Sequence, residues 1–123
     1  MQPTYILLVV NDPLASATFY ERILGTAALE TQKTFALFRM NPKTMLGLWS
    51  KHTIEPAVTV APGSTELCFV LDSVEAVDEC HETWKAQGLP ILQTPVDADF
   101  GYTFTATDPD GHRLRVFRPS HQG

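Results

Sequence analysis

The feature that most constrains the fold is an internal repeat, because the two halves of the chain share one order of segments. A β-branched, apolar segment at 4–10 is followed by a helical pattern and then by three shorter strand-like segments. The same order begins again at residue 66. Each half therefore predicts a strand, a helix and three further strands.

In the first half, capping signals mark both ends of the predicted helix. Asn11 or Asp12 can cap its N-terminus, and Pro13 suits the first turn because its missing N–H would have no partner there. Gly25 ends the helix. The later strands are predicted at about 28–31, 34–40 and 44–50, with a turn at 41–42.

The second half repeats these signals. Asp72, followed by Glu75, forms a capping-box signature, and Trp84 lies on the apolar side of the helix as an expected core residue. The helix is expected to close at 88–90. Strands are predicted at 66–71, 91–93, 102–107 and 112–118, and the Asp-Pro-Asp-Gly sequence at 108–111 joins the last two as a hairpin.

Together these segments predict an α+β fold made of two repeated βαβββ modules. The first module covers about 1–50, a linker covers about 51–63, and the second module covers about 64–119. Neither module could bury both faces of its sheet alone. We therefore expect one domain, residues 1–123, whose cupped mixed sheet surrounds a cleft.

The charge and the chain's beginning narrow the classes of function. The formal net charge is −5, which argues against a nucleic-acid binder and weakly favours neutral or cationic ligands over anionic ones. No segment stays apolar for the roughly 20 residues that a membrane span needs, and the sequence starts without a signal-peptide pattern. We therefore expect a cytoplasmic protein that binds neither nucleic acid nor membrane.

The two cysteines carry no metal signal. Cys68 and Cys80 are twelve residues apart, which matches no zinc-binding spacing. A cytoplasmic chain has no need of a disulfide. Both are interpreted as small core residues.

The ordering of these motifs resembles the vicinal-oxygen-chelate superfamily, which includes glyoxalase I, extradiol dioxygenases and the bleomycin and fosfomycin resistance proteins. The resemblance rests on Asn-Asp before the first helix, Phe-Tyr within it, Leu-Gly at its end, and Asp-Pro-Asp-Gly-His-Arg-Leu-Arg-Val-Phe at the end of the chain's second half. It covers nearly the whole chain, and it implies modules whose first and fourth strands are neighbours at the centre of a cupped sheet.

The resemblance also places four positions that hold metal ligands in the superfamily's enzymes. They correspond here to Tyr5, Gly47, Glu66 and Arg115. Only Glu66 is an ordinary ligand for a hard cation, and arginine would repel one. We therefore expect no metal and no cofactor. Tyr5 is expected to stand beside Gly47, and Glu66 beside Arg115 as an ion pair that either fills the former metal site or only stabilises the interior.

Alternation along the strands then suggests which side chains line the cleft. The face that carries the ligand positions includes Trp49 and Cys68, while family comparison adds Thr103 and Thr105 and puts Tyr102 and Phe104 beneath the helix. Phe35 or Phe38 is expected at the rim. The candidate ligand-binding residues are Tyr5, Phe38, Trp49, Glu66, Cys68, Thr103, Thr105 and Arg115.

The resemblance is strongest to metal-free antibiotic-binding members such as the phenazine resistance proteins. It implies a homodimer that sequesters a small, planar aromatic molecule, with Trp49 stacking on it. The alternative is a glyoxalase- or dioxygenase-like lyase or oxidoreductase that uses an atypical divalent-metal site or Glu66 as a general base. Core packing is the competing interpretation of Trp49.

Overall fold

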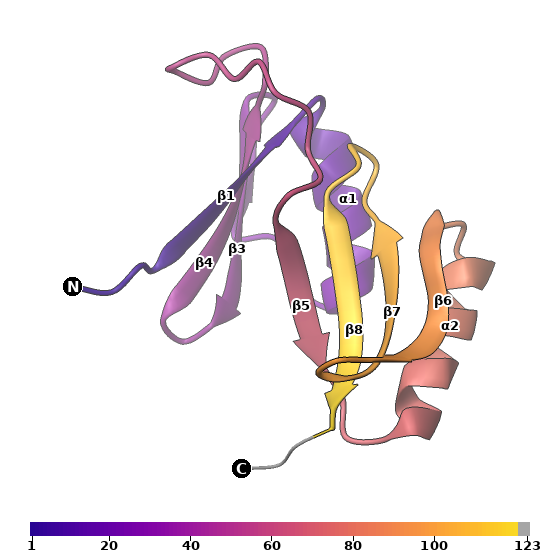
Figure 1. Cartoon of the computed structure of the whole chain (residues 1–123). Helices are drawn as coiled ribbons and strands as arrows, with labels where there is room; N and C mark the ends of the chain where they lie inside the picture. Colours follow the sequence, from indigo (N-terminus) through magenta and orange to yellow (C-terminus); the bar gives the residue numbers. More distant parts are fainter. Residues whose placement is uncertain (121–123) are drawn as a thin grey trace. The chain divides into compact units, whose positions relative to one another are not determined.

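The computed structural model describes residues 1–120, so His121 and the two residues after it lie outside the described part. The chain divides into two compact units, residues 1–61 and the residues from Pro62 onward. Both have the predicted order of elements, which can be followed by colour along the chain in Figure 1. The α+β prediction of two βαβββ modules is confirmed.

Module one contains β1 (Tyr5–Val10), α1 (Pro13–Leu24), β2 (Glu30–Thr31), β3 (Phe35–Asn41) and β4 (Thr44–Ser50). Its four strands form one sheet in the order β1-β4-β3-β2. The first and fourth strands are parallel neighbours as the resemblance implies, although β1 is an edge of this sheet. The α1 helix packs on one face of the sheet, against β3 and β4.

Module two repeats this arrangement with β5 (Glu66–Val70), α2 (Val74–Ala86), β6 (Ile91–Ala98), β7 (Gly101–Thr107) and β8 (Arg113–Pro119). Its strand order is β5-β8-β7-β6, with β5 parallel to β8 and the other pairs antiparallel. The α2 helix packs against β6, β7 and β8.

The helix ends agree with the predicted signals except at the start of α2. Asp12 caps α1, accepting hydrogen bonds from the backbone N–H groups of Leu14 and Ala15, and Gly25 ends it with a φ of +69°. The cap of α2 is Ser73, whose hydroxyl accepts from the Ala76 N–H, and not Asp72. The capping-box prediction was wrong by one residue, because the side chain that caps a backbone N–H of the first turn belongs to Ser73 and not to Asp72.

Both cores lie between a helix and the sheet face that it covers. In module one, Phe38 is fully buried and packs edge-to-face with Tyr20 of α1, their ring centroids 6.5 Å apart. In module two, Trp84 packs edge-to-face on Phe104 at 5.5 Å, which confirms that this tryptophan belongs to the core. The placement of Phe38 at a cleft rim was wrong, because strand alternation turns it toward the helix.

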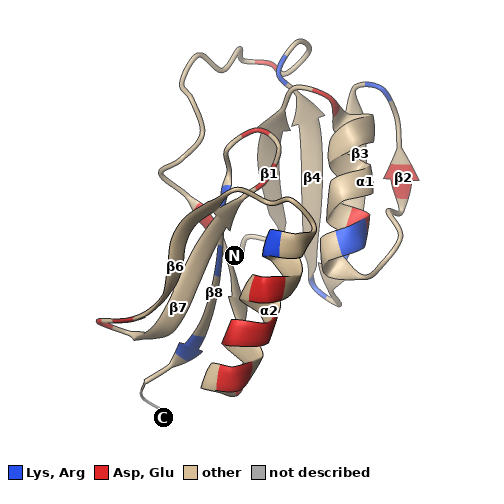
Figure 2. Ribbon diagram, turned by 90° about the vertical axis from the view of Figure 1, so that its right-hand side faces the viewer, with Lys and Arg blue, Asp and Glu red and all other residues tan. Residues whose placement is uncertain are grey.

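The outer side of α2 carries the acidic residues of its sequence. Figure 2 marks acidic positions in red along the α2 ribbon, and Glu75, Asp78, Glu79 and Glu82 are all exposed. A solvated helix face accounts for this cluster. Among residues 1–120, no helix has the length and apolar character needed to cross a membrane.

Candidate functional site

The helix-free face of module one presents an aromatic pair. Phe35 of β3 and Trp49 of β4 are partners in the strand register, and their rings meet edge-to-face with centroids 6.4 Å apart. Both side chains are half-buried. The face opposite α1 therefore offers an aromatic surface that the module's own core does not use.

Between these aromatics and β1 lies a position without a side chain. Gly47 is in register with Leu7, and a Cβ added at Gly47 would lie 2.5 Å from the Leu7 Cδ2 and 2.9 Å from the Phe35 Cζ. Tyr5 stands instead opposite Met45 and is 56% exposed. The predicted pairing of Tyr5 with Gly47 was therefore wrong by two residues, and Leu7 and Phe35 fill the space.

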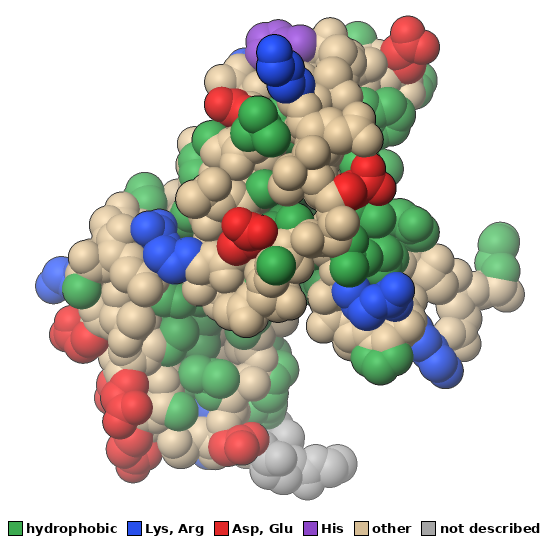
Figure 3. Space-filling view, turned by 180° about the vertical axis from the view of Figure 1, so that it is seen from behind, with side chains coloured by type: hydrophobic (Ala, Val, Ile, Leu, Met, Phe, Trp, Pro, Cys, Tyr) green, Lys and Arg blue, Asp and Glu red, His purple; other side chains and the backbone are tan. Residues whose placement is uncertain are grey.

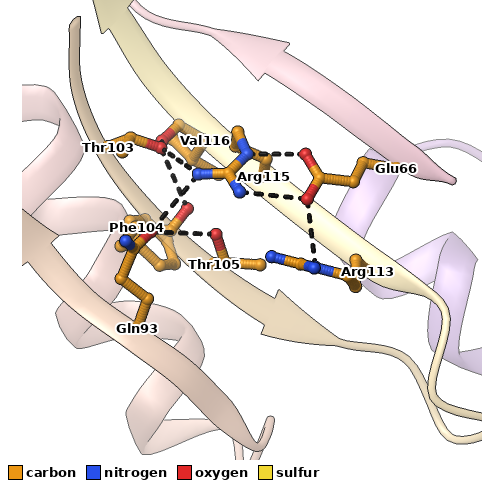
Figure 4. Close-up of polar contacts among 8 residues, drawn as sticks. All are labelled: Glu66, Gln93, Thr103, Phe104, Thr105, Arg113, Arg115 and Val116. Carbon is orange, nitrogen blue, oxygen red and sulfur yellow. Dashed lines mark hydrogen bonds and ion pairs between the residues drawn. The ribbon is translucent and has the colours of Figure 1, made fainter. Parts of the chain in front are cut away.

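The helix-free face of module two carries a charged network centred on Arg115 (Figure 4). The Arg115 Nε donates to the Glu66 Oε1 at 2.6 Å and its Nη2 donates to the Glu66 Oε2 at 3.0 Å. This two-point geometry is the strong form of an arginine–carboxylate pair. The predicted contact between Glu66 and Arg115 is present, although the strand register sets Glu66 opposite Arg113 and Cys68 opposite Arg115.

The same guanidinium is held from its other side by β6 and β7. The Arg115 Nη1 donates to the Thr103 hydroxyl at 3.2 Å and to the Gln93 side-chain oxygen at 3.3 Å. Thr105 donates to that same Gln93 oxygen at 3.2 Å. Thr103 and Thr105 lie on the Arg115 face as expected, but both are fully buried beneath this network, so their hydroxyls bind protein partners.

The sequence did not predict the role of Phe100, which lies beside this network. The ring of Phe100 lies 5.0 Å from that of Phe117, edge-to-face, and the Arg115 Cζ lies 5.6 Å from the centroid of Phe100. Phe100 is 42% exposed. A guanidinium over a ring face is a cation–π contact, which further fixes Arg115.

Neither cysteine is fully buried, although both were predicted to be small core residues. Cys68 is exposed on the Arg115 face, so its description as a core residue was wrong and its place on that face stands. Desolvation and the nearby Glu66 carboxylate raise the pKa of its thiol. Cys80 is partly buried, and burial raises its pKa to about 11. Both thiols are therefore protonated near neutral pH, which makes them weak nucleophiles.

The electrostatics of Glu66 bear on its possible role as a base. The hydrogen bonds from Arg115, with the positive charges of Arg115 and Arg113, lower the pKa of Glu66 against an opposing effect of burial. The same pair raises the pKa of Arg115. A carboxylate whose pKa is lowered and whose two oxygens accept from arginine is a poor acceptor for a substrate proton at neutral pH.

The four positions that hold metal ligands in related enzymes do not form a fitting donor set. Tyr5 and Gly47 contribute neither imidazole nor carboxylate, and Arg115 occupies both oxygens of Glu66. Within residues 1–120, no three histidine, cysteine, aspartate or glutamate side chains come together. These residues therefore suit an ion pair and not a divalent cation.

Replacing Glu66 by glutamine should flatten the acid side of the stability profile. The folded pKa of Glu66 lies below its unfolded value, so its contribution is complete above about pH 4.3 and is lost as the pH falls through the folded pKa. Arg115 stays protonated throughout this range, so it does not change how the free energy of unfolding depends on pH. As the pH is lowered from about 6 to about 3, the free energy of unfolding measured with urea should fall by about 1–2 kcal/mol more in the parent than in Glu66→Gln. Equal losses in the two proteins would contradict the stabilising role of the ionised Glu66 carboxylate.

The two βαβββ modules, each with its first and fourth strands paired, define a glyoxalase-like fold. The sequence model of the Glyoxalase/Bleomycin resistance protein/Dioxygenase superfamily matches residues 2–116. The chain therefore belongs to that superfamily, as its motifs predicted.

Individual relatives agree with this assignment. The chain is 45% identical to protein ATC0852 from Agrobacterium tumefaciens, solved by solution NMR, with a TM-score of 0.90 over 98% of this chain and 99% of that one. A glyoxalase-related enzyme from Fulvimarina pelagi is 27% identical, with a TM-score of 0.82 over 96% of this chain and 88% of the other.

A third relative has a named biological role. The phenazine antibiotic resistance protein EhpR of Enterobacter agglomerans is 27% identical over 117 residues, which cover 93% of this chain and 89% of that protein. Membership of the superfamily and this similarity fit the binding of a small molecule.

Proposed function

We propose that this protein binds and sequesters a small planar aromatic molecule of the phenazine type, without metal-dependent catalysis. The observation that carries the proposal is the half-buried Phe35–Trp49 pair on the helix-free face of module one. Aromatic rings of this kind stack on flat ligands at little entropic cost, because they have few rotatable bonds. Similarity to a phenazine resistance protein supports the choice of ligand class.

The charged face of module two supports binding over catalysis. The Glu66–Arg115 pair occupies two positions at which related enzymes hold metal ligands, and its geometry stabilises the ionised carboxylate. Both thiols are protonated near neutral pH. A sequestering protein requires none of these groups to transfer a proton.

Trp49→Ala should weaken phenazine binding about tenfold or more, because stacking on one aromatic side chain contributes about 1–3 kcal/mol. Titration calorimetry measures the dissociation constant directly and avoids the absorbance of the ligand. The chain has two tryptophans, so Trp84→Phe is the matched control: it changes the core and should leave the dissociation constant unchanged. If Trp49→Ala binds phenazine as tightly as the parent, Trp49 does not stack on the ligand.

We propose in addition that the protein is a homodimer, as the resemblance implies. Apolar side chains reach the surface among charged ones on the face shown in Figure 3, and Tyr5 and Leu7 of β1 are 56% and 46% exposed. Exposed apolar side chains on an edge strand favour coverage by a partner. Sedimentation equilibrium should give twice the mass of the chain at micromolar concentration, whereas the mass of one chain would contradict this proposal.

A further inference from the structure

The fourth strands of the two modules carry a glycine and an arginine at equivalent positions. Gly47 of β4 pairs with Leu7 of β1. Arg115 of β8 pairs in the same way with Cys68 of β5. Each is followed two residues later by an aromatic residue of the same strand. The internal repeat therefore presents one position twice, once without a side chain and once with a long one.

The residue diagonally across from this position has the complementary size. In module two it is Thr103, a small residue whose hydroxyl accepts a hydrogen bond from the Arg115 Nη1 at 3.2 Å. In module one it is Phe35, whose ring comes so close to Gly47 that an added Cβ would lie 2.9 Å from its Cζ and 3.1 Å from its Cε1. A large residue thus accompanies the glycine and a small one the arginine, as close packing between neighbouring strands requires.

The Phe35 ring contacts Trp49 as well as the backbone of Gly47. The two rings meet edge-to-face, with centroids 6.4 Å apart and planes at 83°, and both side chains are half-buried. A Cβ at position 47 could not remain 2.9 Å from a ring carbon, so the Phe35 ring would have to move. Its contact with Trp49 would then change as well.

We infer that Gly47 is a positioning residue of the proposed ligand site. Because Gly47 has no side chain, the Phe35 ring extends over it and orients the Trp49 ring for stacking. This role rests on the proposed function and deepens it, since it assigns the residue that determines how the aromatic pair is arranged.

Titration calorimetry with phenazine tests this role through a pair of substitutions. Gly47→Ala should raise the dissociation constant about fivefold, because the displaced Phe35 ring no longer orients Trp49. Phe35→Leu should cause a similar loss, since leucine lacks the Cε1 and Cζ atoms that approach Gly47. Adding Gly47→Ala to Phe35→Leu should then cause no further loss, because Gly47 acts through the Phe35 ring.

A second pair of variants separates this role from a general packing defect. The closest atom to an added Cβ is the Leu7 Cδ2, at 2.5 Å, and Leu7→Ala removes it. Leu7→Ala/Gly47→Ala should therefore stay folded, which thermal melting checks. It should still bind phenazine about fivefold more weakly than Leu7→Ala, because the approach to the Phe35 ring remains.

Near-ultraviolet circular dichroism reports on the aromatic pair without any ligand. The chain has two tryptophans, so in a Trp84→Phe background the tryptophan bands come from Trp49 alone. These bands depend on fixed tertiary contacts. Gly47→Ala should change them, whereas the matched control Gly111→Ala, where an added Cβ meets nothing within 4 Å, should not.

The outcomes separate the role of Gly47 from the proposed function. Unchanged Trp49 bands or an unchanged dissociation constant in Gly47→Ala would overturn this role, and so would losses that multiply when Gly47→Ala is added to Phe35→Leu. In each of these cases the parent still binds phenazine and the proposed function stands. If the parent does not bind phenazine, the proposed function is overturned, and the role of Gly47 in ligand binding with it.

Discussion

Gly101→Ala should lower the free energy of unfolding by about 3 kcal/mol or more. Gly101 begins β7 with a φ of +156°, in a region that residues with a Cβ rarely adopt. A Cβ there would overlap the backbone carbonyl oxygen of Arg118 and lie 3.0 Å from the Pro119 Cα. Because these obstacles are backbone atoms of the neighbouring strand, no side-chain rotation relieves them.

Gly111→Ala is the matched control for this change. Gly111 has a φ of +94°, but an added Cβ would meet nothing within 4 Å, so only the backbone strain remains. This substitution should cost about 1 kcal/mol. Urea unfolding of both variants separates the clash from the strain, and equal losses for the two would contradict the packing described at Gly101.

Arg115→Met should lower the free energy of unfolding by about 2–3 kcal/mol. It removes both hydrogen bonds to Glu66, and the Thr103 hydroxyl and the Gln93 oxygen also lose a donor. The side chains of Arg115 and Glu66 are only 14% and 23% exposed, so water compensates them incompletely. The Glu66 carboxylate then keeps only the ion pair with Arg113, whose Nε lies 3.0 Å from the Glu66 Oε2 without an aligned hydrogen bond.

Two further variants test the cause of that loss. Arg39→Met is the control, because Arg39 is exposed and donates to the Pro42 carbonyl at 3.3 Å, so its loss should cost less than about 0.5 kcal/mol. In Glu66→Gln/Arg115→Met the carboxylate that lost both hydrogen bonds from Arg115 is gone, and about 1 kcal/mol of stability should return relative to Arg115→Met. Additive losses in the double variant would contradict the coupling of the two side chains.

The sequence predicted most elements because local signals determine them. The 44–50 strand has the predicted bounds, and Asp12, Pro13 and Gly25 act as expected at the ends of α1. The 91–93 strand was predicted too short, since β6 continues past Pro95 to Ala98. Proline is tolerated there because β6 is an edge strand whose register shifts between Gln93 and Val96.

Alternation along a strand predicts which face of the sheet a residue of the candidate site occupies, but not its neighbours on other strands. The family comparison put Thr103 and Thr105 on the face of Arg115, where the structure has them, and alternation contained the signal for Arg113, which is two residues from Arg115. Alternation cannot fix the register between strands, so Tyr5 was placed beside Gly47 when Leu7 is its neighbour. Phe100 lies in the turn between β6 and β7, and its contacts with Phe117 and Arg115 depend on tertiary packing alone.

Titration of the protein with phenazine after dialysis against EDTA tests the central claim most directly, namely that a planar aromatic ligand is bound without a divalent metal. Calorimetry should give the same dissociation constant before and after dialysis, and added zinc or manganese should not change it. Binding that disappears with EDTA and returns with a metal would contradict the claim, as would the absence of binding under every condition.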